Sequence, residues 1–230
     1  MPNVMAKVFW AFLLVLIGVL SGCSGEDEKE KASTGPTSHA RGVYMLIDTS
    51  GTYTRELRKA QQIINVLLSK LYPGDSFAVA RIDTGSFSEK DIVAKVTFDD
   101  RPSKANQQKR IFKEEINKFV KSVKPASYTD ITGGILQAAE YLNEKNPGQK
   151  TILIFSDLKE ELDKRYNRDI QFKLKGYDVI ALNVTKLRTD NFNPQEYLDR
   201  LQEWQIRVES GGGKWKVTND MDQIDNILIN

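Results

Sequence analysis

The stretch VYMLIDTSGT, residues Val43–Thr52, decides the fold of this chain. Its first five residues form a short, continuous apolar run, which is typical of a strand buried on both faces of a parallel sheet. Its polar half, Asp48 to Thr52, follows directly at the carboxyl end of that strand. Open α/β sheets bind their ligands at this edge, so the same stretch indicates both the fold and the place of a site.

The residues that follow alternate between strand and helix patterns. Short apolar runs predict further strands at 77–82, 92–98, 151–155, 178–184 and 214–218. Apolar residues at helical spacing predict helices over about 57–71, 104–123 and 131–142, one that begins at Asn193-Pro194, and a last one from Asp220. Residues 41–230 are therefore expected to form one α/β domain, with a doubly wound, mostly parallel six-stranded sheet, one antiparallel edge strand and helices on both faces.

The lengths of the connections predict which loops meet. The segment from Asp83 to Asp91 has only nine residues, too few for a parallel crossover of about 12 or more, so strand 92–98 should be an antiparallel hairpin partner. The next helix must then return to the edge where Asp48 lies. Three polar segments should meet there: Asp48–Thr52, Thr129-Asp130 and Ser156-Asp157.

These segments supply only hard oxygen donors. Carboxylates and hydroxyls of this kind suit Mg²⁺ and, with looser geometry, Mn²⁺ or Ca²⁺. Because hydroxyls are neutral, an ion held by two carboxylates keeps an affinity for a further anionic oxygen. Read singly, each segment also has a structural interpretation, as a tight turn or a helix N-cap. Asp130 is expected to be structural, as a cap or a support for Thr129.

The motif Asp48-Thr49-Ser50-Gly51-Thr52 resembles the DxSxS loop of von Willebrand factor type A (vWA) domains, and the resemblance extends over residues 41–230. It implies a metal-ion-dependent adhesion site, and no enzymatic activity. Hydroxyls would bind the ion directly and carboxylates mostly through water, while a Glu or Asp of a protein partner would complete the coordination. The implied residues are Ser50, Thr52 and Thr129 for the hydroxyls, and Asp48 and Asp157 for the carboxylates. Thr52 stands where the family has a second Ser.

Two other interpretations remain open. YMLIDTSGT also resembles the motif of haloacid-dehalogenase-like phosphotransferases, which implies Mg²⁺-dependent phosphatase activity with Asp48 as the nucleophile. Ser50 stands where those phosphatases have an acid, and the acidic pair Asp99-Asp100 is expected at the opposite edge of the sheet. A vWA-like domain with a purely structural role in an envelope assembly is the other alternative. Tyr53 and Tyr128 flank the predicted ion, either as a rim for a partner or as buried residues.

The N-terminal residues predict export and anchoring. The 13 apolar residues from Val8 to Leu20 are too few to span a bilayer but suit a secretory signal. Leu20-Ser21-Gly22-Cys23 resembles the bacterial lipobox, which implies a signal peptide over 1–22, a lipidated Cys23 and a flexible tether over 23–40; the alternative is an ordinary signal peptide. We therefore expect a lipid-anchored, extracytoplasmic protein of a bacterial envelope. Ser24 favours the outer membrane if the host has two membranes.

The composition excludes several classes of function. The 33 Lys and Arg nearly balance the 31 Asp and Glu, which argues against a nucleic-acid partner. A single Cys and a single His exclude an intrachain disulfide and a Cys/His zinc cluster. His39, in the tether, is expected to be solvated. The basic stretches Lys104–Lys113 and Lys159–Lys175 are expected to be solvated helix faces.

Overall fold

The computed structural model describes residues 37–51, 53–83, 85, 88–220 and 227. The predicted signal peptide, Cys23 and Thr52 lie outside these residues, as does most of the predicted final helix. Within the described part of the chain, no helix is long and apolar enough to cross a membrane.

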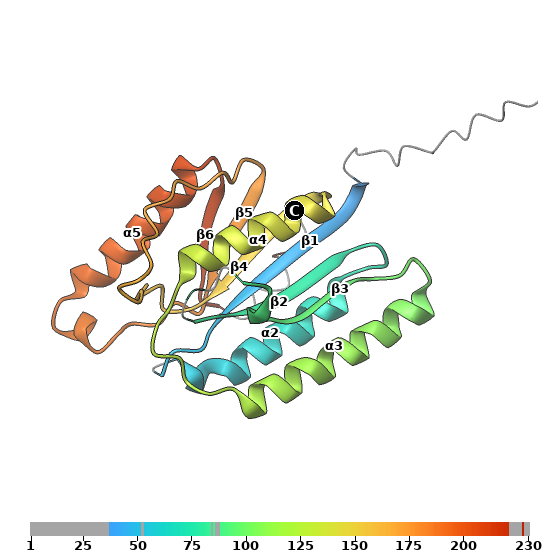
Figure 1. Ribbon diagram of the computed structural model, residues 1–230, viewed down its shortest axis with the longest axis horizontal. Helices are drawn as coiled ribbons and strands as arrows, with labels where there is room; N and C mark the ends of the chain where they lie inside the picture. Colours follow the sequence, from blue (N-terminus) through green and yellow to red (C-terminus); the bar gives the residue numbers. More distant parts are fainter. Residues whose placement is uncertain (1–36, 52, 84, 86–87, 221–226, 228–230) are drawn as a thin grey trace, which may run out of the picture. The chain divides into compact units, whose positions relative to one another are not determined.

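Six strands form one sheet. They are β1 (Thr37–Asp48), β2 (Ser76–Ile82), β3 (Ile92–Thr97), β4 (Pro147–Phe155), β5 (Tyr177–Leu182) and β6 (Lys214–Thr218). Their order is β3-β2-β1-β4-β5-β6, with β1 in the middle (Figure 1). Only the hairpin partner β3 is antiparallel, and it lies at the edge. The predicted fold class is confirmed: a doubly wound, mostly parallel sheet with one antiparallel edge strand.

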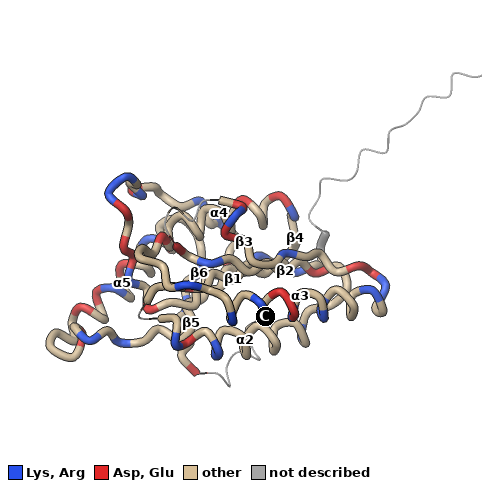
Figure 2. The backbone as a smooth tube through the Cα atoms, turned by 60° about the horizontal axis from the view of Figure 1, so that its bottom comes forward, with Lys and Arg blue, Asp and Glu red and all other residues tan. Residues whose placement is uncertain are grey.

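Helices cover both faces of this sheet. The described helices are α2 (Leu57–Lys70), α3 (Pro102–Ser122), α4 (Ile131–Lys145) and α5 (Pro194–Ser210), with 3-10 turns η1 (Thr54–Glu56), η2 (Glu89–Asp91) and η3 (Thr189–Asn191). In Figure 2, α2 and α3 lie on one side of the strands and α4 lies on the other. The core divides in the same way, because α2 and α3 pack in one apolar cluster while α4 and α5 pack in the other.

The alternating side chains of β1 build both halves of the core. Val43, Met45 and Ile47 point into the cluster of α2 and α3, whereas Tyr44 and Leu46 point into that of α4 and α5. All five are fully buried, as the continuous apolar run predicts. Ile227, the one described residue beyond Asp220, is also buried in the first cluster. This packing fixes β1, and with it the position of Asp48 at its carboxyl end.

The structure differs from the sequence-based expectations at three places. β1 begins at Thr37 and β4 at Pro147, and these residues pair, so residues 37–40 belong to the sheet rather than to the tether. Asn193 occupies the N-cap position of α5, but its side chain does not cap the helix. No helix lies between β4 and β5, so the prediction of a helix face at Lys159–Lys175 is wrong. Long-range contacts shape that segment, as described below.

Candidate functional site

Asp48 is the fully buried last residue of β1. Its Oδ1 accepts a hydrogen bond from the Ser50 amide at 2.8 Å. Its Oδ2 accepts one from the Ser156 hydroxyl, just beyond β4, at 2.6 Å. Because β1 and β4 are neighbouring parallel strands, their carboxyl ends bring these two loops into contact.

The third loop joins the other two through its backbone. The Ala126 amide donates to the Thr49 carbonyl at 2.8 Å, which ties the segment before α4 to the Asp48 loop. Thr129 and Glu161 exchange two backbone hydrogen bonds, at 2.8 and 3.0 Å, which ties that segment to the residues after Asp157. The three polar segments that the sequence predicts at one edge therefore form a closed ring of contacts.

This ring brings four of the five predicted metal-binding residues to one edge of the sheet. Asp48, Thr129 and Asp157 are at most 3% exposed, and Ser50 is partly exposed. The fifth residue, Thr52, lies outside the described residues. Within the described part of the chain, no three His, Cys, Asp or Glu side chains form a cluster that could hold a metal ion. The predicted ligand set itself contains only two carboxylates, with hydroxyls as the remaining donors.

Burial makes ionisation of the two carboxyls costly. It raises the pKa of Asp157 to about 6, with a further increase from the charge of Asp48 and an opposing contribution from the Lys159 amide, which donates to Oδ1 at 2.9 Å. Burial also raises the pKa of Asp48, whereas hydrogen bonds from Ser156 and Ser50 lower it in part. Two buried carboxylates that destabilise each other, beside neutral hydroxyls, fit the needs of a hard divalent cation, since such an ion offsets their repulsion.

Asp130 has the structural role predicted for it. As the N-cap of α4, its Oδ1 accepts from the Gly133 amide at 2.7 Å. Its carboxylate also forms a salt bridge with Arg168, with Nη2 at 2.8 Å from Oδ2. One buried carboxylate thus holds the helix start next to Thr129 and also anchors the segment between β4 and β5.

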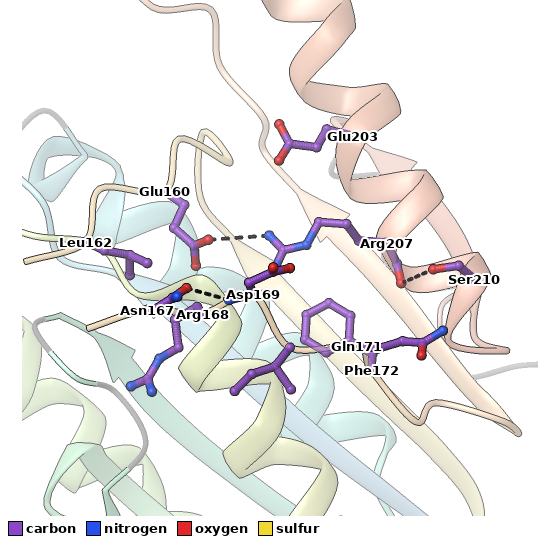
Figure 3. A pocket seen from close by; sticks show the side chains of 11 residues that line it. Glu160, Leu162, Asn167, Arg168, Asp169, Gln171, Phe172, Glu203, Arg207 and Ser210 are labelled. Atoms are coloured by element: carbon purple, nitrogen blue, oxygen red, sulfur yellow. Dashed lines mark hydrogen bonds and ion pairs between the residues drawn. The ribbon is translucent and has the colours of Figure 1, made fainter. Parts of the chain in front are cut away.

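A second polar network braces the same segment. The Glu160 carboxylate accepts from the Thr132 amide at 2.6 Å and from the Thr132 hydroxyl at 3.0 Å. Arg207 of α5 donates to that hydroxyl at 2.7 Å and pairs with Glu160 at 3.4 Å. Glu160 and Arg207 border a cleft of about 490 Å³ between the segment and α5 (Figure 3). The network therefore links α4, α5 and the loop that carries Asp157.

Arg200 supports the backbone of Asp157. Its Nε donates to the Asp157 carbonyl at 2.9 Å, and its Nη2 pairs with the buried Asp190 carboxylate at 2.8 Å. Asp190 Oδ2 also accepts from the Leu187 amide at 2.6 Å. α5 thereby holds the Asp157 loop and the loop after β5 in one arrangement.

The two tyrosines that flank the predicted ion have different environments. Tyr53 is buried against Phe155, and its hydroxyl donates to the Asn183 carbonyl. Tyr128 is exposed. Tyr53 is therefore a buried core residue, and Tyr128 is accessible to a partner.

The acidic pair required by the phosphatase interpretation lies at the other end of the sheet. Thr97, two residues before Asp99, pairs with Ser76 at the start of β2, whereas Asp48 pairs with Ile82 at its end. Asp99-Asp100 therefore lies at the edge opposite Asp48, as predicted from the strand directions.

Sequence reasoning missed the charged supports of this site. Arg168, Arg200 and Arg207 contact partners 10 to 75 residues away, and no local pattern marks them. One general signal was present: an Asp or Glu predicted to be buried, such as Asp130, needs a cationic or hydrogen-bonding partner.

By sequence, the chain matches no family model and no curated protein. By structure, it is similar to a von Willebrand factor type A protein from Catenulispora acidiphila, with a TM-score of 0.54 and 14% identity over 81% of this chain and 40% of that one. It is also similar to the pilus adhesin SpaC from Lactobacillus rhamnosus GG in its open conformation, with a TM-score of 0.52 and 12% identity over 85% of this chain and 30% of that one. The chain thus spans less than half of either protein. Together with the sheet order, these similarities show that the chain has the fold of a von Willebrand factor type A domain.

Proposed function

We propose that this domain binds a protein partner through a divalent cation, Mg²⁺ in the first instance with Mn²⁺ or Ca²⁺ as alternatives. The residues proposed to hold the ion are Asp48, Ser50, Thr52, Thr129 and Asp157. The observation that carries the proposal is the ring of contacts among three loops, which encloses two buried carboxylates with raised pKa values. Burying two carboxylates costs the fold free energy, and a bound cation would offset that cost.

Some residues at this edge would bind the ion, and others hold the loops that carry them. Ser50 and Thr129 offer neutral oxygens, so that the bound cation keeps an affinity for an outside carboxylate. Asp48 already accepts hydrogen bonds from Ser50 and Ser156, an arrangement that suits indirect coordination through water. Asp130 and Arg200 do not belong to the ligand set; they hold the Thr129 and Asp157 loops in place. Recognition then depends on coordination, without a catalytic step.

We further propose that the domain works outside the cytoplasm, attached to a bacterial membrane through lipidated Cys23. The lipobox-like Leu20-Ser21-Gly22-Cys23 supports this, and Ser24 favours an outer membrane where the host has two. A partner in the same envelope or on another cell would meet the domain at the edge that carries Asp48.

The proposal is tested by capturing envelope or surface proteins with the immobilised chain, in Mg²⁺ and in EDTA. Wild type should retain a specific partner in Mg²⁺ only, and Asp48→Ala and Thr129→Ala should retain none. Asp99→Ala, which removes a carboxylate at the opposite edge, is the matched control and should retain the partner. Capture that persists in EDTA and in both site variants would favour the purely structural role instead.

A further inference from the structure

A cleft of about 520 Å³ opens beside the proposed ion site. Gly51 and Tyr53 of the first loop line one part of it, the 185–189 loop lines another, and Asp157 is in its wall. This volume lies in the range of about 300–1,000 Å³ that is typical of ligand pockets. The cleft is therefore large enough to hold a short segment of a partner next to the predicted ion.

Positive charge predominates among the described residues that line this cleft. Four of its described lining residues are the exposed cations Arg55, Lys159, Lys186 and Arg188, and the one acid among those described residues is the buried Asp157. Lys159 pairs with Glu161, but both side chains are about half exposed, and such pairs contribute little. Lys186 lies over the Tyr197 ring, at 5.8 Å from its centroid, and its charge helps to lower the pKa of Asp190. Among the described residues, no salt bridge involves Arg55 or Arg188. The described part of the chain thus leaves positive charge available in this cleft.

The loop that carries two of these cations is held in place. The Leu187 amide, between Lys186 and Arg188, donates to Asp190, which Arg200 fixes in turn. At the start of the loop, Asn183 has a left-handed backbone (φ 54°), and its side chain donates to Tyr53 and Glu56. Charges on a braced loop lose less conformational freedom when a ligand binds than charges on an unsupported one.

The other cleft near the site, shown in Figure 3, has a different character. Its two lining arginines are paired within the chain: Arg207 with Glu160, and Arg168 with Asp130. Those pairs brace the loop after Asp157 and occupy both arginines, while the lining acids Asp169 and Glu203 would repel an acidic ligand.

We infer that the cleft beside Asp157 binds an acidic segment of the partner, whose carboxylates pair with Arg55, Lys186 and Arg188. The inference rests on the proposed function, because it assumes that one partner carboxylate coordinates the ion. It adds that the partner residues next to that carboxylate in sequence are also Glu or Asp and lie in the cleft. Complementary charge of this kind governs both partner choice and the rate of association.

The test uses a fluorescein-labelled hexaglutamate peptide and the full chain in a nonionic detergent, with anisotropy as the readout. We expect saturable binding that is tighter in Mg²⁺ than in EDTA and weakens between about 50 and 500 mM salt. The double variant Lys186→Glu/Arg188→Glu should weaken binding at least tenfold. Its matched control, Lys118→Glu/Lys121→Glu on the exposed side of α3, makes the same change in net charge and should alter affinity less than twofold.

The outcomes separate this inference from the proposed function. No peptide binding, an equal loss in the α3 control, or tripolyphosphate competing as well as the peptide would each overturn the acidic-segment assignment. Thermal stabilisation by Mg²⁺, measured on the same samples, reports on the ion site alone. If Mg²⁺ stabilises the chain while the peptide fails to bind, the ion site stands and the cleft assignment is wrong.

Discussion

The substitution Asp157→Asn should stabilise the metal-free protein at neutral pH. Folding raises the pKa of this carboxyl from 3.8 to about 6, mainly through burial and then through the charge of Asp48. At about 1.36 kcal/mol per pH unit, the ionised side chain costs the folded state about 3 kcal/mol at pH 7.5. Asparagine has nearly the same shape, keeps an oxygen for the Lys159 amide, and carries no charge. For a domain of this size we expect a rise in melting temperature of about 6–12 °C.

The sign of the pH dependence follows from the direction of the shift. Because the pKa of Asp157 is raised in the folded state, its stabilising contribution is complete below the unfolded pKa of 3.8 and is lost as the pH rises through about 6. The advantage of Asp157→Asn should therefore be large at pH 7.5 in EDTA and vanish near pH 4. Saturating Mg²⁺ should reduce the difference in melting temperature between the variant and wild type at pH 7.5, because the cation stabilises the ionised carboxylate of the wild type.

The assay is a series of thermal melts in EDTA from pH 4 to 8, with Asp190→Asn as the control. Asp190 is equally buried, but its pairing with Arg200 lowers its pKa, so its asparagine variant should be less stable at pH 7.5. If Asp157→Asn lowers the melting temperature at pH 7.5 by as much as Asp190→Asn does, the electrostatic account of the site is refuted.

Three further predictions concern the supports of the site and the anchor. Arg168→Ala leaves the buried Asp130 without its cation and should lower the free energy of unfolding in urea by about 3 kcal/mol; a loss below 1 kcal/mol would contradict the pairing. Gly134→Ala would place a Cβ about 3.0 Å from the buried Leu46 side chain. We expect the free energy of unfolding to fall by about 1–3 kcal/mol, although alanine favours the helix more than glycine does. A higher urea midpoint for this variant would contradict the prediction. Cys23→Ser should abolish acylation, measured by palmitate labelling and membrane partition, and unaltered partition would argue for an ordinary signal peptide.

Much of the fold is predictable because its signals are local. The apolar run of β1, the helical spacing of α2 and the short connection before β3 each depend on neighbouring residues. The length of that connection sets the direction of β3, and the direction in turn brings Thr129 and Asp157 to the edge with Asp48. The meeting of these loops therefore follows from connectivity.

What could not be predicted depends on distant contacts. The start of β1 at Thr37 has no apolar pattern, and it is part of the sheet because it pairs with Pro147. The segment between β4 and β5 has many charges, but Glu160 and Arg168 are bound to α4, so it does not form a helix. The paired roles of Arg200 and Asp190 likewise exist only after α5 has packed against the sheet.

Titration of the metal-stripped full chain with Mg²⁺, Mn²⁺ and Ca²⁺, followed by melting temperature, tests the central claim most directly. An ion at 100 times its dissociation constant stabilises the folded state by about 2.7 kcal/mol, which corresponds to a rise of about 5–11 °C. We predict this rise for wild type and no rise for Asp48→Ala. The substitution removes the carboxylate that in wild type accepts hydrogen bonds from Ser50 and Ser156. No shift with any of the three ions at millimolar concentrations, or the same shift in Asp48→Ala, would contradict the account.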